Sequence, residues 1–255
     1  MLKKLRNNRF LFSCLVKRDF ALKYKRTVLG MVWSALSPLF NLLIMWLVMS
    51  NFFGSNINHY AIYLFSGQIV YSYFCDATNQ GMTSLIDNAG LFTKVCVPKY
   101  LFLLSKNVSS LISFVITFVL LLIFSLIDGL PITWEFLLLL YPITMLLIFN
   151  VGVGLILSAL FVFFRDMQYL WGIFTQLIMW LSTIFYTIDV FPQRVQDLFM
   201  LNPVFLFISY FRSIVIDGAI PSNVIHLLIA LDTAMVVGVG SWFYKRYNHQ
   251  FLYYV

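Results

Sequence analysis

Acid and base side chains would carry any catalytic chemistry, and this chain of 255 residues has few of them. His59, His226 and His249 are spread along the sequence and form no common site. The nucleotide-binding pattern GxxxxGK[ST], the zinc-protease pattern HExxH and the hydrolase pattern GxSxG are all absent. Two acids, Asp76 and Asp232, fall within apolar stretches, where a carboxylate is costly and therefore a functional candidate. We expect Asp76 to be hydrated near a membrane face. For Asp232 the sequence leaves two roles open, a structural one and proton coupling.

Composition predicts an integral membrane protein. Apolar residues make up 61% of the chain and charged residues 11%, whereas soluble domains carry about a quarter charged residues. Six apolar runs approach or exceed the ~20 residues that span a bilayer as a helix, namely 32–53, 60–80, 105–127, 135–163, 168–187 and 222–244. Read as six spans, they place fifteen of the seventeen basic residues on one side. We therefore expect an all-α membrane domain, 1–255, with both termini cytoplasmic.

The net charge of +7 suggests an anionic partner. The basic residues border the apolar runs and do not form one exposed face, so membrane lipid is expected and nucleic acid is not. Cys14, Cys75 and Cys96 offer neither a disulfide framework nor metal-ligand spacing, and no metal is expected in this chain. No cleavable signal peptide is evident, because a long basic segment precedes the first apolar run.

Two cytoplasmic segments carry patterns of their own. Residues 1–31 contain an amphipathic helix, about 8–24, whose apolar arc is interrupted by Asp19 and Lys23. We expect it to lie at the membrane surface, with its apolar face against lipid or protein. Residues 81–99 read GMTSLIDNAGLFTKVCVPK and predict a short helix at 82–87, a turn, and an exposed apolar pair. Such a pair marks either a contact with a partner or packing on the chain's own spans.

An external segment, 188–221, is too apolar for a plain loop. Its pattern predicts two short helices broken at Asn202–Pro203 that dip into the bilayer without crossing it. Residues 204–216 are too few to span, and a seventh span would put Lys245 and Arg246 on the wrong side.

Four short motifs, in order and spacing, resemble one transporter family. They are YKRTVLGMVWSALSPL at 24–39, NAGLFTKVCVPK at 88–99, FRD at 164–166, and LNP at 201–203 followed by YFR at 210–212. Together they resemble the permease subunits of ATP-binding cassette exporters of polysaccharides, of the O-antigen, capsule and teichoic acid type. One difference is the sequence STIFY at 182–186, which lacks the Pro that family members commonly carry there. The fifth helix is therefore expected to run on without a break.

The resemblance implies the membrane-spanning subunit of an ATP-driven exporter. Its substrate would be a lipid-linked polysaccharide moved from the cytoplasmic side across the bacterial inner or plasma membrane. The chain would act as a homodimer with two separate ATPase subunits, which would bind the ATP and Mg, so it is not itself expected to be an enzyme. The segment 81–99 would couple the ATPase to the spans. The residues implied in coupling are Leu85, Asn88, Leu91, Phe92, Lys94 and Pro98.

A glycan conduit should combine aromatic faces with small polar groups, because sugar rings have apolar faces and polar rims. Stripes of this kind are Trp33, Ser37 and Phe40 in the first span, and Gln168, Trp171, Thr175, Met179, Ser182 and Tyr186 in the fifth. Such residues also serve as interface belts and helix contacts, and the sequence leaves both readings open. By resemblance, the external gate would comprise Asn202, Pro203, Tyr210 and Arg212.

Three other classes of function are alternatives to a polysaccharide exporter. A small-molecule or lipid exporter of the same permease superfamily is the nearest alternative. A proton-coupled carrier would need inverted repeats and an intramembrane acid cluster, whereas only Asp232 stands deep in a span. A membrane transferase would need clustered acid and base residues near one interface, and neither face offers them.

Overall fold

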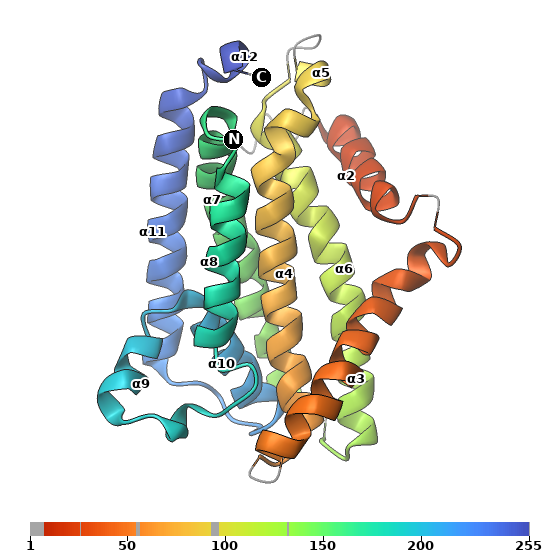
Figure 1. The fold of residues 1–255 in the computed structure, drawn as a ribbon, viewed down its shortest axis with the longest axis vertical. Coiled ribbons are helices and arrows are strands. Elements are labelled where there is room, and N and C mark those ends of the chain that lie inside the picture. Colours follow the sequence, from red (N-terminus) through yellow and green to blue (C-terminus); the bar gives the residue numbers. More distant parts are fainter. Residues whose placement is uncertain (1–7, 26, 55–56, 93–96, 132, 255) are drawn as a thin grey trace.

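A bundle of long helices fills the part of the chain that the computed structural model describes, residues 8–25, 27–54, 57–92, 97–131 and 133–254. Every regular element in these ranges is helical, as predicted. In chain order they are α2 (Arg9–Tyr24), η1 (Gly30–Val32), α3 (Trp33–Phe53), α4 (Tyr60–Asp87), α5 (Ala89–Phe92), α6 (Tyr100–Ile127), η3 (Trp134–Leu139), α7 (Leu140–Phe163), α8 (Met167–Leu181), η4 (Ile188–Val190), α9 (Gln193–Phe199), α10 (Pro203–Val215), α11 (Asn223–Tyr247) and α12 (Phe251–Tyr254). Figure 1 shows α4 in the middle, and we call the two ends of the bundle the α5 end and the α9 end.

Membrane-spanning capacity is clear for four helical segments of the described chain. They are Gly30–Phe53, Tyr100–Ile127, Trp134–Phe163 and Asn223–Tyr247. The pair α9–α10 would add a fifth if it counted as one span, but its two helices are bent by 98°. The chain is thus a multi-pass, all-α membrane protein across its described residues. Of the six predicted runs, 60–80 and 168–187 do not meet this test of length and composition.

α4 is long enough to span but carries many polar residues, and the other helices enclose it. Seventeen of its 28 residues are buried, and it packs against α3, α6, α7, α8 and α10. Its buried hydroxyls donate within the helix, from Thr78 to the Phe74 carbonyl at 2.7 Å and from Ser84 to the Gly81 carbonyl at 2.6 Å. These internal bonds give the two buried hydroxyls an acceptor within their own helix. The separate helix predicted at 82–87 was wrong, since it is the last part of α4.

Glycines bring the backbones of α7 and α11 together. A Cβ on Gly240 would lie 2.5 Å from the Gly152 carbonyl oxygen, and a Cβ on Gly152 would lie 2.9 Å from the Val237 nitrogen. Gly81 of α4 and Gly154 of α7 also meet closely, with 3.3 Å from an added Cβ to the opposing Cα. Close approach through small residues is the usual way for helices to associate where lipid gives no hydrophobic driving force. α4, α7 and α11 therefore form the tightly packed part of the bundle.

The predicted fifth helix, 168–187, was too long, because α8 ends at Leu181 even without a proline. Thr183 then adopts a left-handed backbone conformation with φ of 49°, and the chain folds back. The end of α8 is held from outside the helix. Asn202 donates from Nδ2 to the Leu181 carbonyl at 3.0 Å and to the Ser182 hydroxyl at 2.9 Å. The helix therefore ends without a proline, and the side chain of Asn202, 21 residues further along the chain, binds its last carbonyl.

The α7–α11 contact leads to a stability prediction. Replacing Gly240 with Ala should lower the free energy of unfolding by about 1–3 kcal/mol, because a backbone carbonyl cannot move aside for the new methyl group. Thermal unfolding in detergent micelles would measure the change. Gly238→Ala is the matched control, since an added Cβ there meets nothing within 4 Å. Equal unfolding midpoints for the two variants would show that the helices do not touch here.

Candidate functional site

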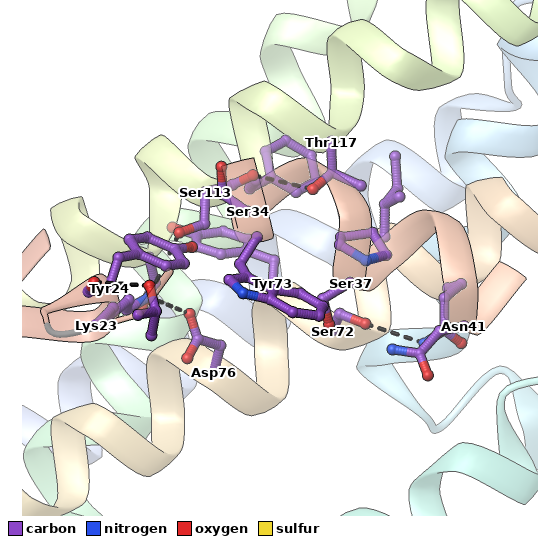
Figure 2. A pocket seen from close by; sticks show the side chains of 17 residues that line it. Lys23, Tyr24, Ser34, Ser37, Asn41, Ser72, Tyr73, Asp76, Ser113 and Thr117 are labelled. Atoms are coloured by element: carbon purple, nitrogen blue, oxygen red, sulfur yellow. Dashed lines mark hydrogen bonds and ion pairs between the residues drawn. The ribbon is translucent and has the colours of Figure 1, made fainter. Parts of the chain in front are cut away.

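A polar cavity of about 500 Å³ lies between the end of α2, the start of α3 and the middle parts of α4 and α6 (Figure 2). Its charged lining residues are Lys23 and Asp76. The neutral polar ones are Thr27, Ser34, Ser37, Asn41, Gln68, Ser72, Ser110, Ser113 and Thr117, and the aromatic ones are Tyr24, Trp33, Tyr73 and Phe114. Pro38 and Ile69 complete the wall. Lys23 and Asp76 lie toward one end of the cavity and Asn41 toward the other (Figure 2).

An ion pair closes the Lys23 end of the cavity. The Lys23 ammonium lies 2.6 Å from Asp76 Oδ2, and it also donates to the Ser113 hydroxyl at 3.5 Å. Gln80 donates to the other Asp76 oxygen at 2.6 Å. Asp76 is therefore a paired and hydrogen-bonded carboxylate, where the sequence suggested only hydration. The pairing was missed because 53 residues separate the partners, although a lysine within the apolar arc of α2 was a signal for it.

The face of α2 toward the bundle is docked by polar contacts. Asp19 is only 3% exposed and accepts from the Ser105 hydroxyl at 2.7 Å and from Arg18 at 2.7 Å. Arg18 also donates to Asn88 Oδ1 at 2.6 Å. Asp19 and Lys23 interrupt the apolar arc where they contact Ser105 of α6 and Asp76 of α4, so this part of the face lies against protein, while Leu22 of the same arc is exposed. The Arg18 contact joins α2 directly to the segment 81–99.

The residues implied in ATPase coupling lie in different environments. Leu85 is fully buried in the core, so any effect of this side chain on a partner is indirect. Asn88 is also buried and donates to the Ser84 carbonyl at 2.8 Å. Leu91, on α5, is 43% exposed and available for contact. Pro98 is half-buried. Lys94 lies outside the described residues.

The C-terminal segment packs beside the end of the 81–99 segment. Lys99 donates to the Asn248 carbonyl at 2.8 Å, and its ammonium lies 5.5 Å from the centre of the fully buried Phe251 ring. Burial lowers the pKa of the Lys99 ammonium from its ordinary value. The start of α6 is therefore held by α11 and α12 as well as by its own helix.

The structure separates the predicted conduit residues into two groups. Trp33 and Ser37 line the polar cavity, whereas Phe40 is exposed and does not line it. On α8, Trp171 donates to the Thr78 hydroxyl at 3.2 Å, and the Thr175 carbonyl accepts from Tyr71 at 2.9 Å, so both residues lie against α4.

Of the remaining residues of the predicted α8 stripe, Met179 continues that face, since it is half-buried and packs against the core, whereas Gln168 is exposed. Ser182 and Tyr186 lie beyond the helix, where the Tyr186 hydroxyl donates to the Trp180 carbonyl. The stripe predicted from helical spacing is therefore limited to the part before Leu181.

At the α9 end, Arg212 of α10 ties three segments together. The residue is 8% exposed, and its guanidinium donates to the carbonyls of Thr183, Tyr63 and Ile184 at 2.9, 3.1 and 3.1 Å. The guanidinium carbon also lies 3.4 Å from the centre of the Tyr63 ring. Gly67 leaves room for it, since a Cβ there would lie 2.8 Å from Nη2. A buried cation needs such compensation, and here it binds α10 to α4 and to the turn after α8.

Of the other predicted gate residues, Asn202 lies at the same turn, and Tyr210 contacts α11. Asn202 caps α10 by accepting from the Val204 amide at 3.1 Å, and Pro203 occupies the first turn. Tyr210 is fully buried, and its hydroxyl lies 2.8 Å from His226 Nε2 of α11. Arg212, Asn202 and Tyr210 thus hold the α8 end, α4 and α11 to one another.

Comparison with protein families gives one assignment for most of the chain. The model of the ABC-2 type transporter family matches residues 11–216. The chain belongs to the ABC-2 type transporter family. The resemblance inferred from the four short motifs is thereby confirmed.

Relatives of this ABC-2 type transporter are similar over nearly their whole length. The O-antigen export system permease protein RfbA of Klebsiella pneumoniae is 25% identical over 247 residues, which cover 95% of each chain. The protein of the same name from Myxococcus xanthus is 25% identical, with 96% of each chain covered. The polysialic acid transport protein KpsM of Escherichia coli is 23% identical, covering 91% of this chain and 92% of the relative.

Nothing in the described part of this ABC-2 type transporter gathers three or more His, Cys, Asp or Glu side chains in a way that could hold a metal ion. A polar cavity lies along α3, α4 and α6. We call the Lys23–Asp76 and Arg18–Asn88 contacts the α2 tether, because they join the cavity wall to the segment 81–99. We call the bonds of Arg212 to the Thr183, Ile184 and Tyr63 carbonyls the Arg212 tether, which holds the α9 end.

The Arg212 tether gives a prediction for local opening. Arg212→Met keeps a long side chain but removes the donors to three carbonyls, and each charged hydrogen bond contributes about 1.5–3 kcal/mol. The amides of 182–187 should then exchange hydrogen at least about tenfold faster, equivalent to ~1.4 kcal/mol. Hydrogen–deuterium exchange read by mass spectrometry measures this rate. Arg194→Met, at an exposed position on α9, is the control, and unchanged exchange in Arg212→Met would refute the tether.

Proposed function

We propose that this chain is the membrane-spanning subunit of an ATP-driven exporter that moves a lipid-linked polysaccharide from the cytoplasmic side across the bacterial inner membrane. The observation that carries the proposal is the similarity over more than nine-tenths of both chains to permeases named for O-antigen export and polysialic acid transport. The glycan could be of the O-antigen, capsular or teichoic acid type. Because no nucleotide-binding GxxxxGK[ST] is present, ATP and Mg are assigned to a separate ATPase subunit.

Six crossings are the topology we propose, made by α3, α4, α6, α7, α8 and α11. α4 needs no apolar surface of its own because its neighbours shield it from lipid. α8 covers only about 22 Å at 1.5 Å per residue, and the turn at 182–186 extends its path. The 98° bend between α9 and α10 supports a re-entrant segment, 188–221, over a further span.

The orientation follows from charge. Fifteen of seventeen basic residues border the proposed crossings on one side in the sequence, and we take that side as cytoplasmic. Figure 1 shows α5 and the C-terminal α12, which belong to that side of the sequence, at the same end of the bundle, so the α5 end is the cytoplasmic one. Arg212 is one of the two exceptions, but its charge is compensated inside the protein. Both termini are then cytoplasmic, and α2 lies at the inner face of the membrane.

Two copies of the chain are proposed to form the export path. Packed helices occupy the centre of one bundle, and α4 fills the space where a channel would run. A polymer must therefore pass at an interface between copies, which a twofold dimer provides. The exposed Phe40 and Gln168 remain proposed conduit residues, with Trp33 and Ser37 facing the polar cavity beside the path. We assign the inward-facing residues of the α8 stripe, Trp171, Thr175 and Met179, to holding α8 in position.

The gate and coupling roles are proposed for the two tethers. At the outer end, Asn202, Pro203, Tyr210 and Arg212 would set how far the end of α8 can move. At the inner end, α5 would receive the motion of the ATPase, and Asn88 would pass it through Arg18 to α2. This chain of contacts gives the ATPase a mechanical connection to the cavity, because Lys23 of the same helix lies in the cavity wall.

The ATPase contact can be tested with one substitution. Leu91→Asp should reduce the amount of ATPase that co-purifies with the permease by at least about tenfold, because a charged group would replace an apolar anchor at the centre of the contact. Pull-down from membranes, with the permease level measured in parallel, gives the readout. Leu198→Asp is the matched control, because Leu198 is an exposed leucine on α9 at the opposite end. Full ATPase recovery with Leu91→Asp would remove α5 from the coupling contact.

A substitution at Asp232 distinguishes ATP-driven export from a proton-coupled carrier. Asp232 is only partly buried on α11 and makes no side-chain hydrogen bond or ion pair with another described residue. Asp232→Asn should therefore leave the amount of glycan at the cell surface within about tenfold of the parent, a limit of ~1.4 kcal/mol on the barrier. Surface labelling with a glycan-specific antibody or lectin measures it. A larger loss at normal permease and ATPase levels would favour a proton-coupled carrier.

A further inference from the structure

The polar cavity lies within one chain, apart from any path between copies. Its walls come from the end of α2, the α2–α3 connection, α3, α4 and α6, and no residue of α8 lines it. Its volume of about 500 Å³ is within the range of small-ligand sites, roughly 300–1,000 Å³. The cavity therefore has the size of a binding site for a small chemical group and not of a passage for a polymer.

Charge in the cavity is balanced. Lys23 and Asp76 are the charged residues of the wall, and they neutralise each other at 2.6 Å. An anionic headgroup would have to compete with Asp76 for Lys23, and a cationic one would have to compete with Lys23 for Asp76. The site consequently favours a neutral ligand.

The hydrogen-bonding groups of the wall include unused donors and unused acceptors. The hydroxyls of Ser72, Ser110 and Ser113 accept from nitrogen donors and donate to no described residue, and the Tyr73 hydroxyl has no partner among the described residues. Ser34 and Thr117 donate their hydroxyl protons to backbone carbonyls at 2.6 and 3.0 Å, which leaves the lone pairs of their oxygens for a ligand. Gln68 Oε1 is enclosed and has no partner among the described residues. A phosphate offers only acceptors at neutral pH, so it could use the donors of this wall but not its acceptors, and the Lys23–Asp76 pair leaves no net positive charge to attract it. A polyhydroxylated ring both donates and accepts, so it can use both kinds of group.

Donors and aromatic surface are present beside these acceptors. The side chains of Ser37 and Asn41 make no hydrogen bond with another described residue, so a hydroxyl and an amide are available to a ligand. Trp33 is 39% exposed and lines the same space, which gives an aromatic face for the apolar side of a sugar ring. Along α3, Phe40 and Ile44 are exposed apolar residues within a segment long and apolar enough to span the membrane. An alkyl chain could lie along them while its polar head entered the cavity.

We propose that this cavity binds one neutral sugar unit presented as the head of a membrane amphiphile. The inference rests on the proposed function, since it identifies the cavity as the place where the lipid-proximal part of the glycan is held within each protomer. When the sugar occupies the cavity, it lies against the wall that contains Lys23. The α2 tether then connects the occupied site to Asn88 and the segment 81–99.

Thiol protection in the permease–ATPase complex tests the proposal without ATP or export. A single cysteine is placed at Ser72, which is exposed and lines the cavity, in a background in which Cys14, Cys75 and Cys96 are replaced by Ala. The complex in lipid nanodiscs is treated with a charged thiol reagent and octyl β-glucoside at a concentration that does not dissolve the discs. The rate at Ser72→Cys should fall by roughly threefold when two thirds of the sites are filled, because only empty sites react.

Three controls decide the result. Tetraethylene glycol octyl ether has the same alkyl chain without the ring of hydroxyl donors, and it should leave the rate unchanged. Asn79→Cys, exposed two turns further along α4 and outside the cavity, should not be protected by either amphiphile. Gln68→Leu in the Ser72→Cys background should abolish protection by the glucoside, and it removes an unpartnered buried acceptor, so the fold should tolerate it.

Each outcome bears on the proposal. Protection by the glucoside alone supports it, whereas equal protection by both amphiphiles, or none by the glucoside, overturns it. Protection by free glucose at the same concentration would overturn the requirement for a lipid-presented head while keeping the sugar site. The assay uses no ATP, so a negative result leaves the export proposal standing, and loss of export in cells leaves the binding result standing.

Discussion

A helix that is too polar to face lipid must be enclosed by other helices, and α4 imposes this constraint on the bundle. The bilayer core has no water to satisfy backbone or side-chain groups, so every polar residue at that depth needs a partner within the protein. α4 meets much of this demand with hydroxyls that bond its own carbonyls and with neighbours on several sides, while Gln68 Oε1 and the Tyr73 hydroxyl, both at the polar cavity, have no partner among the described residues. The glycine contacts of α7 keep that enclosure tight, because backbone lies against backbone at Gly152 and Gly240.

The enclosure is incomplete along one side of α4, and the polar cavity lies there. Between α3 and α6 the packing leaves room for a ligand, and α2 closes one end through the Lys23–Asp76 pair. An ion pair holds two segments in register, and it can separate at a lower energetic cost than an apolar core can, because each partner here retains some contact with solvent. The closed end of the cavity is thus also the part of the wall best suited to move.

Much of the fold follows from patterns that are local in sequence. Apolar runs, flanking charge and the Asn-Pro break predict the helices, the amphipathic α2 and the short helices before and after Asn202. Contacts between distant segments do not follow from such patterns. The end of α8 depends on Asn202, so the predicted fifth helix was too long and its stripe ran past Leu181. The environment of Asp76 depends on Lys23, which lies 53 residues away in the sequence. In the first span, Trp33 and Ser37 line the polar cavity and Phe40 does not, and the part of all three in a conduit stays a prediction.

The Arg212 site also constrains the order in which the protein can be made. All the carbonyls that receive the guanidinium belong to residues before it in the chain, Tyr63, Thr183 and Ile184. The ribosome completes the acceptors first and the cation last. The reverse arrangement would leave a charged side chain without its partners while 149 further residues were added, roughly 7–30 s at ordinary rates of translation. When Arg212 is added to the chain, the residues that supply its three carbonyl acceptors have therefore already been synthesised.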